Sequence, residues 1–193
     1  RILGNEPYEC PMKPFGGIEQ LAWSPDSKQI AYTCRKKTGL DYAVSTDSDI
    51  YLYNIESGKT TNLCKPANYI APKVDYTRSL KDQAVNAPIK EGKDYNLGYD
   101  TNPQFSPDGK FIGWQSMERD GYESDRNRLC VYEIATGKKA YVTELFQSGV
   151  DAFCWAENST NLFFIGTWHG CTHVYVTNLN GQIKKITDGQ YDY

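Results

Sequence analysis

Short runs of alternating apolar and polar residues, separated by polar turns, recur along most of the chain. An alternation with a period of two predicts β-strands that bury one face. One ten-residue frame of this kind occurs three times without a gap, beginning at Trp23, Phe105 and Trp155. Each copy opens with an aromatic residue, passes through a turn such as Ser-Pro-Asp-Gly, and then resumes the alternation. Proline fixes φ and small polar side chains bond to nearby backbone in such turns, so each frame predicts a β-hairpin.

A second predicted hairpin follows each copy of the frame. Its two strands meet at a turn that contains glycine, and the three turns are Glu56-Ser-Gly-Lys59, Ala135-Thr-Gly-Lys138 and Asn180-Gly-Gln182. Four strands in a repeat of about 40–50 residues are typical of a β-propeller blade. The pattern therefore predicts an all-β fold, namely a β-propeller fragment of about three four-stranded blades.

The chain is expected to be part of one propeller domain. The predicted segments are the end of a preceding blade at 1–14, blades at 15–64, 99–143 and 147–187, an insertion at 65–98, and the start of a next blade at 188–193. Propellers close with about four to eight blades, so three blades are not closed by themselves. Either the chain is a fragment of a larger propeller, or its open edges pair with another copy in an edge-to-edge self-association.

Connections of very different length are predicted on the two faces of the propeller. The turns within hairpins are short, whereas the other face holds the connections 35–49, 65–98, 117–127 and the shorter 167–170. Binding residues concentrate in loops that a rigid scaffold positions, so this elaborated face is predicted to bind or dock a partner.

The connection 65–98 is longer than usual. Its segment 77–85 is predicted to form two helical turns. Two interpretations stay open for this connection: an insertion packed on the propeller rim, or a lid or inter-domain contact.

Composition narrows the function classes. The chain has 21 Lys and Arg against 24 Asp and Glu, a net charge of −3. Nucleic-acid and anionic-membrane binders use a basic face, so neither kind of partner is expected. No apolar run approaches the roughly 18 residues of a membrane span. The chain begins without an initiator methionine or a signal-like segment, which indicates a piece of a longer protein.

The cysteines have no spacing typical of a zinc site. They are Cys10, Cys34, Cys64, Cys130, Cys154 and Cys171. Because most lie in apolar strand-like runs, we interpret them as unpaired packing residues rather than as a disulfide framework.

Motifs of catalytic chemistry are missing from the sequence. It has no G-x-S-x-G, no Walker loop and no H-E-x-x-H, and only His169 and His173 offer an imidazole base. We therefore expect no catalytic residue and no cofactor in this chain. The two histidines and Cys171 alternate along a predicted strand and could bind zinc, but Gly170 is expected to form a turn that breaks the alternation. We therefore predict no metal site.

The segment 117–126 carries four acidic and two basic side chains on the elaborated face. Two interpretations apply to it. The favoured one is a solvated ion-pair lattice that orders the loop and contributes little energy. The other is a binding site for the charged end of a ligand, in which arginine grips a carboxylate or carbonyl with two hydrogen bonds.

A family resemblance adds to this interpretation. The repeated frame resembles the Tol-B-type propeller repeat. More specific are Gly98-Tyr-Asp-Thr-Asn-Pro-Gln-Phe-Ser-Pro-Asp-Gly109, Ser116-Met-Glu-Arg-Asp-Gly-Tyr-Glu-Ser-Asp-Arg-Asn-Arg-Leu129, Tyr42-Ala-Val-Ser-Thr-Asp-Ser-Asp-Ile-Tyr-Leu-Tyr53 and Gly166-Thr-Trp-His-Gly170. Together they look like the N-terminal propeller of the bacterial dipeptidyl peptidase V group in the prolyl oligopeptidase family. The resemblance covers nearly the whole chain except 65–93.

The resemblance implies a serine exopeptidase that removes dipeptides from peptide N-termini. Its propeller would cap a C-terminal α/β-hydrolase domain of the same parent chain, exclude large folded substrates and anchor the ammonium group of the peptide substrate. Glu118 and Asp120 would be the anchoring carboxylates, and Arg119 would orient a carbonyl or those carboxylates. The related dipeptidyl peptidase IV uses a Glu-Glu pair where this sequence has Glu118-Arg119. The candidate substrate-binding residues are Glu118, Arg119, Asp120, Tyr122, Arg126 and Trp168.

The resemblance also implies a periplasmic or cell-surface location. Two other functions remain as alternatives. One is a Tol-B-like propeller that binds proteins through the same face without peptidase activity. The other is a structural or carbohydrate-binding propeller, for which the aromatic residues Trp168, Tyr122 and Tyr42 would supply the contacts. A G-x-S-x-G motif further along the parent chain would distinguish the peptidase from both.

Overall fold

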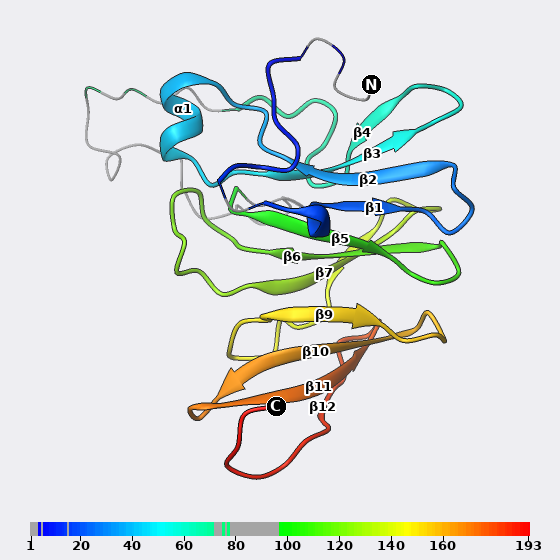
Figure 1. Ribbon diagram of the computed structural model, residues 1–193, viewed down its shortest axis with the longest axis vertical. Coiled ribbons are helices and arrows are strands. Elements are labelled where there is room, and N and C mark those ends of the chain that lie inside the picture. Colours follow the sequence, from blue (N-terminus) through cyan, green and yellow to red (C-terminus); the bar gives the residue numbers. More distant parts are fainter. Residues whose placement is uncertain (1–3, 5, 15, 72–74, 76, 78–96) are drawn as a thin grey trace.

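The computed structural model describes residues 4, 6–14, 16–71, 75, 77 and 97–193. Its strands form three four-stranded antiparallel sheets, which lie one after another along the long axis of the molecule (Figure 1). The first sheet contains β1 (Leu21–Trp23), β2 (Gln29–Cys34), β3 (Asp49–Asn54) and β4 (Thr60–Asn62). The second contains β5 (Asp100–Phe105), β6 (Phe111–Ser116), β7 (Arg128–Glu133) and β8 (Lys139–Tyr141). The third contains β9 (Ala152–Trp155), β10 (Asn161–Trp168), β11 (Cys171–Asn178) and β12 (Ile183–Lys185).

Each sheet is built from consecutive strands that pair with their neighbours in chain order. This is the arrangement of propeller blades, and among the described residues the three sheets do not close into a ring. The predicted fold class, a fragment of about three four-stranded blades, is confirmed. The described helices are the short α1 (Gly39–Val44) and the 3₁₀ turn η1 (Ile18–Gln20), and neither is long and apolar enough to cross a membrane.

The aromatic residue at the end of each repeated frame lies on the sheet face that packs against the preceding sheet. Trp114 of β6 lies in one buried cluster with Leu52 of the first sheet. Phe164, at the same frame position on β10, lies in another with Val131 of the second sheet. Tyr32 is the third equivalent residue, and it faces away from the second sheet, where the segment 6–14 packs on it. Two of the three hydrophobic clusters among the described residues therefore fill the spaces between adjacent sheets.

The aromatic residue that opens each frame follows the same rule. Phe105 packs on the cluster between the first and second sheets. Trp155 stacks on Phe111 of the second sheet, with ring centroids 6.1 Å apart. Trp23 opens the first frame and is 61% exposed, because no sheet precedes it among the described residues. Its exposure marks a surface that one further sheet would cover.

The turn inside each frame has a residue in the left-handed backbone region at its fifth position. Ser27, Gly109 and Ser159 have φ values of 60°, 71° and 58° there. Glycine adopts this conformation without steric cost, whereas serine adopts it at a cost. The turn is closed by a side chain, since the Ser24 hydroxyl accepts a hydrogen bond from the Gln29 N–H at 2.9 Å.

The sequence predictions for the cysteines and for the helices have different outcomes. None of the six cysteines, all of which lie among the described residues, forms a disulfide, as predicted. The helical turns predicted at 77–85 lie outside the described residues, apart from Thr77. Helix α1 was not predicted, because its six residues carry no amphipathic repeat and no side chain caps its first turn.

Candidate functional site

The long connections open on one side of the molecule. Figure 1 shows α1, the connection between β6 and β7, and the β10–β11 turn on its left side, whereas the turns β1–β2, β5–β6 and β9–β10 lie on the right. The left side is the elaborated face that the sequence predicts. It contains all six candidate substrate-binding residues.

Asp120 holds two of these connections together. Its carboxylate accepts hydrogen bonds from the Ser45 hydroxyl and the Thr46 backbone N–H, each at 2.7 Å. The Thr46 hydroxyl in turn accepts one from the Gly121 N–H at 2.8 Å. Asp120 is only 9% exposed, so its carboxylate is directed into the protein and not towards a ligand.

Arg119 is engaged within its own loop. Its Nε donates to the Asp125 carboxylate at 3.0 Å, and its guanidinium lies 4.1 Å from the ring centroid of Tyr122. Burial raises the pKa of Asp125, but the hydrogen bonds from Arg119 outweigh it and the net shift is downward. This is the arrangement of an ion pair that orders a loop.

The other candidates do not converge on one point. Arg126 donates to the Phe146 carbonyl and, at 3.4 Å, to Glu144. Trp168 ends β10 and lies edge-on against His169, with ring centroids 4.8 Å apart. Glu118 is exposed. Of the six candidates, Glu118, Tyr122 and Trp168 therefore present side chains to solvent, while the charged groups of the others are bound within the protein.

A cavity of 540 Å³ opens beside this loop. Its walls come from the segment Met12–Pro14, the 3₁₀ turn η1, and the ends of β2, β5 and β6. Arg35, Tyr99, Glu123 and Asn127 are among the polar residues of these walls. Of these four residues, only Glu123 belongs to the charged segment 117–126 that the sequence singled out, and none was a candidate substrate-binding residue. They come from three separate segments, and only the fold brings them together.

Two buried polar atoms in this cavity wall have no partner. They are Arg35 Nε, a donor, and Asn127 Oδ1, an acceptor, and they are two of four such side-chain atoms among the described residues. Leaving a buried polar group without a hydrogen bond costs about 1–3 kcal/mol. Arg35 and Asn127 both line the cavity, and each keeps one hydrogen-bonding atom that no protein group uses.

Arg35 is fixed in its position by other contacts. One terminal nitrogen donates to the Ser45 carbonyl, and the guanidinium carbon lies 3.9 Å from the ring centroid of Tyr42. Tyr99 is hydrogen-bonded to Arg35 and Glu123, and burial raises the pKa of its hydroxyl. The guanidinium of Arg35 and the carboxylate of Glu123 thus both contact Tyr99 in the cavity wall. This combination suits a ligand that carries groups of both charges, or one with an ammonium group beside a carbonyl.

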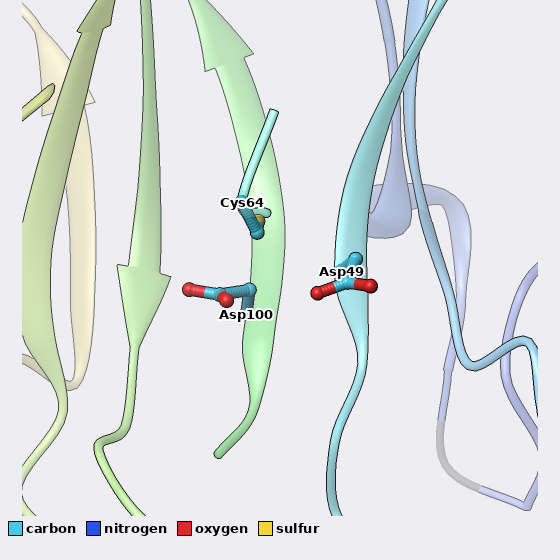
Figure 2. Close-up of side chains that lie close together, drawn as sticks. All are labelled: Asp49, Cys64 and Asp100. Atoms are coloured by element: carbon cyan, nitrogen blue, oxygen red, sulfur yellow. The ribbon is translucent and has the colours of Figure 1, made fainter. Parts of the chain in front are cut away.

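One cluster among the described residues has the spacing of a metal site. Ligand atoms of Asp49, Cys64 and Asp100 all lie within 4.8 Å of one another. Asp49 begins β3 of the first sheet and Asp100 begins β5 of the second, whereas Cys64 follows β4 (Figure 2). Lys65 Nζ already forms an ion pair with Asp49, and with Asp47 at 2.6 Å. The ammonium group of Lys65 therefore supplies the positive charge that this cluster needs.

The other polar groups of the cluster are buried and hydrogen-bonded. Burial raises the pKa of Asp100 to about 7 and raises that of the Cys64 thiol well above its ordinary value. The Cys64 sulfur accepts a hydrogen bond from the Ile50 N–H at 3.1 Å, and Trp114 Nε1 donates to Asp100 at 2.8 Å. The polar atoms of the cluster are thus engaged by Lys65, Trp114 and the Ile50 N–H within the protein. The cluster joins the first two sheets.

The histidines of the third sheet are also separated as expected. Trp168 pairs with Cys171 across β10 and β11, so His169 and Gly170 form a two-residue turn with positive φ. His173 is buried and contacts the Thr187 hydroxyl at 3.2 Å. The alternation that would place both histidines on one strand face is broken at the turn.

The chain is similar in sequence and in fold to several known proteins. No model of a known protein family matches the chain. Over its whole length it is 46% identical to "Dipeptidyl-peptidase 5" of Porphyromonas gingivalis and 42% identical to "Dipeptidyl-peptidase 5" of Porphyromonas endodontalis. The chain covers 24% of each relative, so it spans about a quarter of their length.

Solved structures agree on the fold. Dipeptidyl peptidase 4 of Porphyromonas gingivalis aligns with 89% of this chain at a TM-score of 0.58 and 13% identity, and the chain covers 24% of it. TolB from Acinetobacter baumannii aligns with 87% of the chain at a TM-score of 0.52 and 16% identity, and 32% of it is covered. At these identities the likeness concerns the fold alone.

Proposed function

We propose that the chain is the non-catalytic propeller part of a serine exopeptidase that removes dipeptides from peptide N-termini. The proposal is supported by the similarity of the whole chain to about a quarter of the length of each dipeptidyl-peptidase 5. The parent protein then carries a C-terminal α/β-hydrolase domain with the nucleophile. The elaborated face of the propeller turns towards that domain and limits access to it. The parent protein acts in the periplasm or at the cell surface.

The 540 Å³ cavity carries the substrate-anchoring part of this proposal. A peptide N-terminus presents an ammonium group, which donates hydrogen bonds, next to a carbonyl, which accepts them. Glu123 and Asn127 Oδ1 would receive the ammonium group, and Arg35 Nε would donate to the carbonyl. The unpartnered donor and acceptor in one cavity wall are the observation on which this assignment depends.

The six candidates from the sequence take different parts in this proposal. Asp120, Arg119 and Arg126 hold the loops of the elaborated face in place through the contacts described above. Glu118, Tyr122 and Trp168 remain candidate contacts for substrate residues that extend beyond the cavity. This division assigns anchoring to Glu123 in place of Asp120, whose carboxylate is already bonded to Ser45 and Thr46.

The two end sheets need cover in the parent protein. Trp23 on the first sheet and Phe163 on the third are 61% and 38% exposed, respectively. Further blades of the parent chain would cover these faces. In the isolated chain of 193 residues the same apolar faces would favour self-association.

The anchoring proposal is tested by changing Glu123 in the parent protein. Glu123→Gln removes the charge but keeps the size, so kcat/KM for a dipeptide substrate with a free amine is expected to fall at least tenfold. Arg35→Lys is expected to raise KM, because the ammonium group of lysine cannot replace the fixed Nε donor. Glu56→Gln is the matched control, since Glu56 is exposed in a short turn on the opposite face. A Glu123→Gln enzyme with the kcat/KM of the Glu56→Gln control would contradict the anchoring role.

A further inference from the structure

Two of the six cysteines meet on the outer face of the first sheet. Cys34 ends β2 and is fully buried, and Cys10 lies in the segment 6–14 that packs on the same face. Both belong to one cluster with aromatic side chains of the sheet, among them Tyr32 and Tyr51. The two cysteines are 24 residues apart in the chain, and the fold brings them into one cluster.

The Cys34 sulfur points at the backbone next to Cys10. Its thiol donates a hydrogen bond to the Glu9 carbonyl oxygen at 3.5 Å. That carbonyl belongs to the peptide unit that begins Cys10, so the Cys34 sulfur lies within a few bond lengths of the Cys10 side chain. The two thiols are also close enough for the charge of Cys10 to raise the pKa of Cys34.

We propose that Cys10 and Cys34 are a redox-sensitive pair, which forms an intramolecular disulfide when the protein meets a small disulfide oxidant. The thiolate of Cys10 attacks one sulfur of the oxidant and releases the other half as a thiol. The thiolate of Cys34 then attacks the Cys10 sulfur of this mixed disulfide and releases the second thiol. Two cysteine thiols are oxidised to one S–S bond, and one oxidant disulfide is reduced to two thiols.

The order of attack follows from exposure. Cys10 is half-buried and accessible from the surface, whereas Cys34 is enclosed. Burial raises the pKa of the Cys10 thiol to about 11 and that of Cys34 to about 12. Because the thiolate is the nucleophile, the reaction is expected to be slow at pH 7 and to accelerate about tenfold per pH unit up to pH 9.

Non-covalent contacts already keep the segment 6–14 on the sheet. Glu6 pairs with Lys36 at 2.6 Å, the Met12 N–H donates to Gln20 at 2.7 Å, and the Lys13 carbonyl accepts from Tyr42 at 3.4 Å. A disulfide would add a covalent tie to these contacts and hinder the opening of the segment.

The tie also concerns the cavity beside Arg35. Met12 and Lys13, just beyond Cys10, form one of its walls. Oxidation would therefore restrict the movement of Met12 and Lys13. Any effect of oxidation on peptide binding rests on the proposed function. The disulfide itself does not.

The test is disulfide mapping of the whole parent protein. The protein is reduced, transferred to a buffer of oxidised glutathione at pH 8.5 without denaturant, quenched with acid, alkylated and digested with trypsin. Trypsin cuts after Lys28 and Arg35, so Cys10 and Cys34 fall in separate peptides. The expected result is a peptide ending at Lys28 that is linked to Gln29–Arg35 and is lost on reduction.

Three variants complete the test. Cys10→Ser and Cys34→Ser are each expected to abolish the linked peptide, whereas Cys154→Ser, in an exposed position on the third sheet, is expected to keep it. Proteolysis within 6–14 of the native protein is expected to slow at least tenfold on oxidation, and only where both cysteines are present. The proposal is overturned if Cys10 and Cys34 are both alkylated after oxidation, or if Cys10 is found joined to glutathione or to another cysteine. These outcomes do not depend on any peptidase activity, so they are distinct from a failure of the proposed function.

Discussion

The Asp120 carboxylate accepts a hydrogen bond from the Thr46 backbone N–H at 2.7 Å, across a sequence separation of 74 residues. With the Ser45 hydroxyl as a second donor, this contact joins the long connections of the first and second sheets. It fixes one side of the elaborated face, and the cavity beside Arg35 depends on the same two connections. The face is therefore held by buried polar contacts between sheets and not by the loops alone.

Removing this contact is expected to loosen the face. Asp120→Ala would leave the Thr46 N–H and the Ser45 hydroxyl buried without their acceptor, at a cost of about 2–3 kcal/mol in the free energy of unfolding. Urea denaturation followed by tryptophan fluorescence measures this change. Glu118→Ala, two residues away and exposed, is expected to stay within about 0.5 kcal/mol of the unmodified protein. Equal stabilities of the two variants would show that the Asp120 contacts contribute nothing.

The buried Asp100 is expected to make stability depend on pH. Burial raises its pKa to about 7 in the folded protein, above the usual value of about 3.9 in an unfolded chain. Between these values the folded state holds the proton more tightly, so the stabilising contribution is full at pH 4 and is lost as the pH rises through 7. Asp100→Asn stays neutral, so its stability relative to the unmodified protein is expected to improve from pH 5 to about pH 7 and then to level off.

Asp108 provides the matched control for this measurement. It lies in an exposed turn, where burial raises its pKa but the hydrogen bonds from Ser106 and Lys110 together outweigh this and lower it. It stays charged throughout the range from pH 5 to pH 8. Asp108→Asn is therefore expected to shift stability by a constant amount across that range. A constant shift for Asp100→Asn as well would mean that Asp100 does not titrate near neutral pH.

Gly166 on β10 is expected to tolerate no side chain. A Cβ atom there would lie 2.7 Å from the Phe146 ring and 2.8 Å from the Gly149 carbonyl oxygen. The Phe146 ring is itself held against Phe164 and Tyr175, with centroids 5.1 and 4.8 Å away. Gly166→Ala is therefore expected to cost about 3 kcal/mol through overpacking. Gly149→Ala, whose Cβ would have its nearest neighbour at 3.7 Å, is the control and is expected to cost well under half as much in the same unfolding measurement.

The turns of the repeated frame allow a reciprocal exchange. Ser27 has a φ of 60° at the position where the second copy has Gly109, with a φ of 71°. Ser27→Gly is expected to stabilise the protein by about 0.5–1 kcal/mol and Gly109→Ser to destabilise it by a similar amount, because only glycine adopts this region without strain. The midpoints of thermal unfolding should move in opposite directions. Changes of the same sign would contradict the strain argument.

The sequence predicted the sheets because their information is local. The alternation in each frame and the turn chemistry around Ser24 lie within ten residues of one another. The same alternation also determines which residues face the preceding sheet, as Trp114 and Phe164 do. Helix α1 was missed because six residues without a side-chain cap carry too weak a pattern.

The candidate site was less predictable because its contacts are distant in sequence. The charged segment was correctly singled out as part of the elaborated face, but its internal roles depend on partners that no local pattern reveals. Asp120 is buried by Ser45 and Thr46, more than 70 residues earlier in the chain. The unpartnered atoms of Arg35 and Asn127 become visible only when three segments meet around one cavity.

We have proposed that this chain is the propeller part of a serine exopeptidase that recognises a free N-terminus. The most direct measurement is labelling of the full-length parent protein with a fluorophosphonate probe, read on a denaturing gel, with and without competing peptides. We predict a labelled protein several times larger than these 193 residues, whose labelling is reduced by a peptide with a free amine and much less by its N-acetylated form. A full-length protein that takes up no probe would contradict the peptidase assignment, and equal competition by both peptides would contradict recognition of the ammonium group.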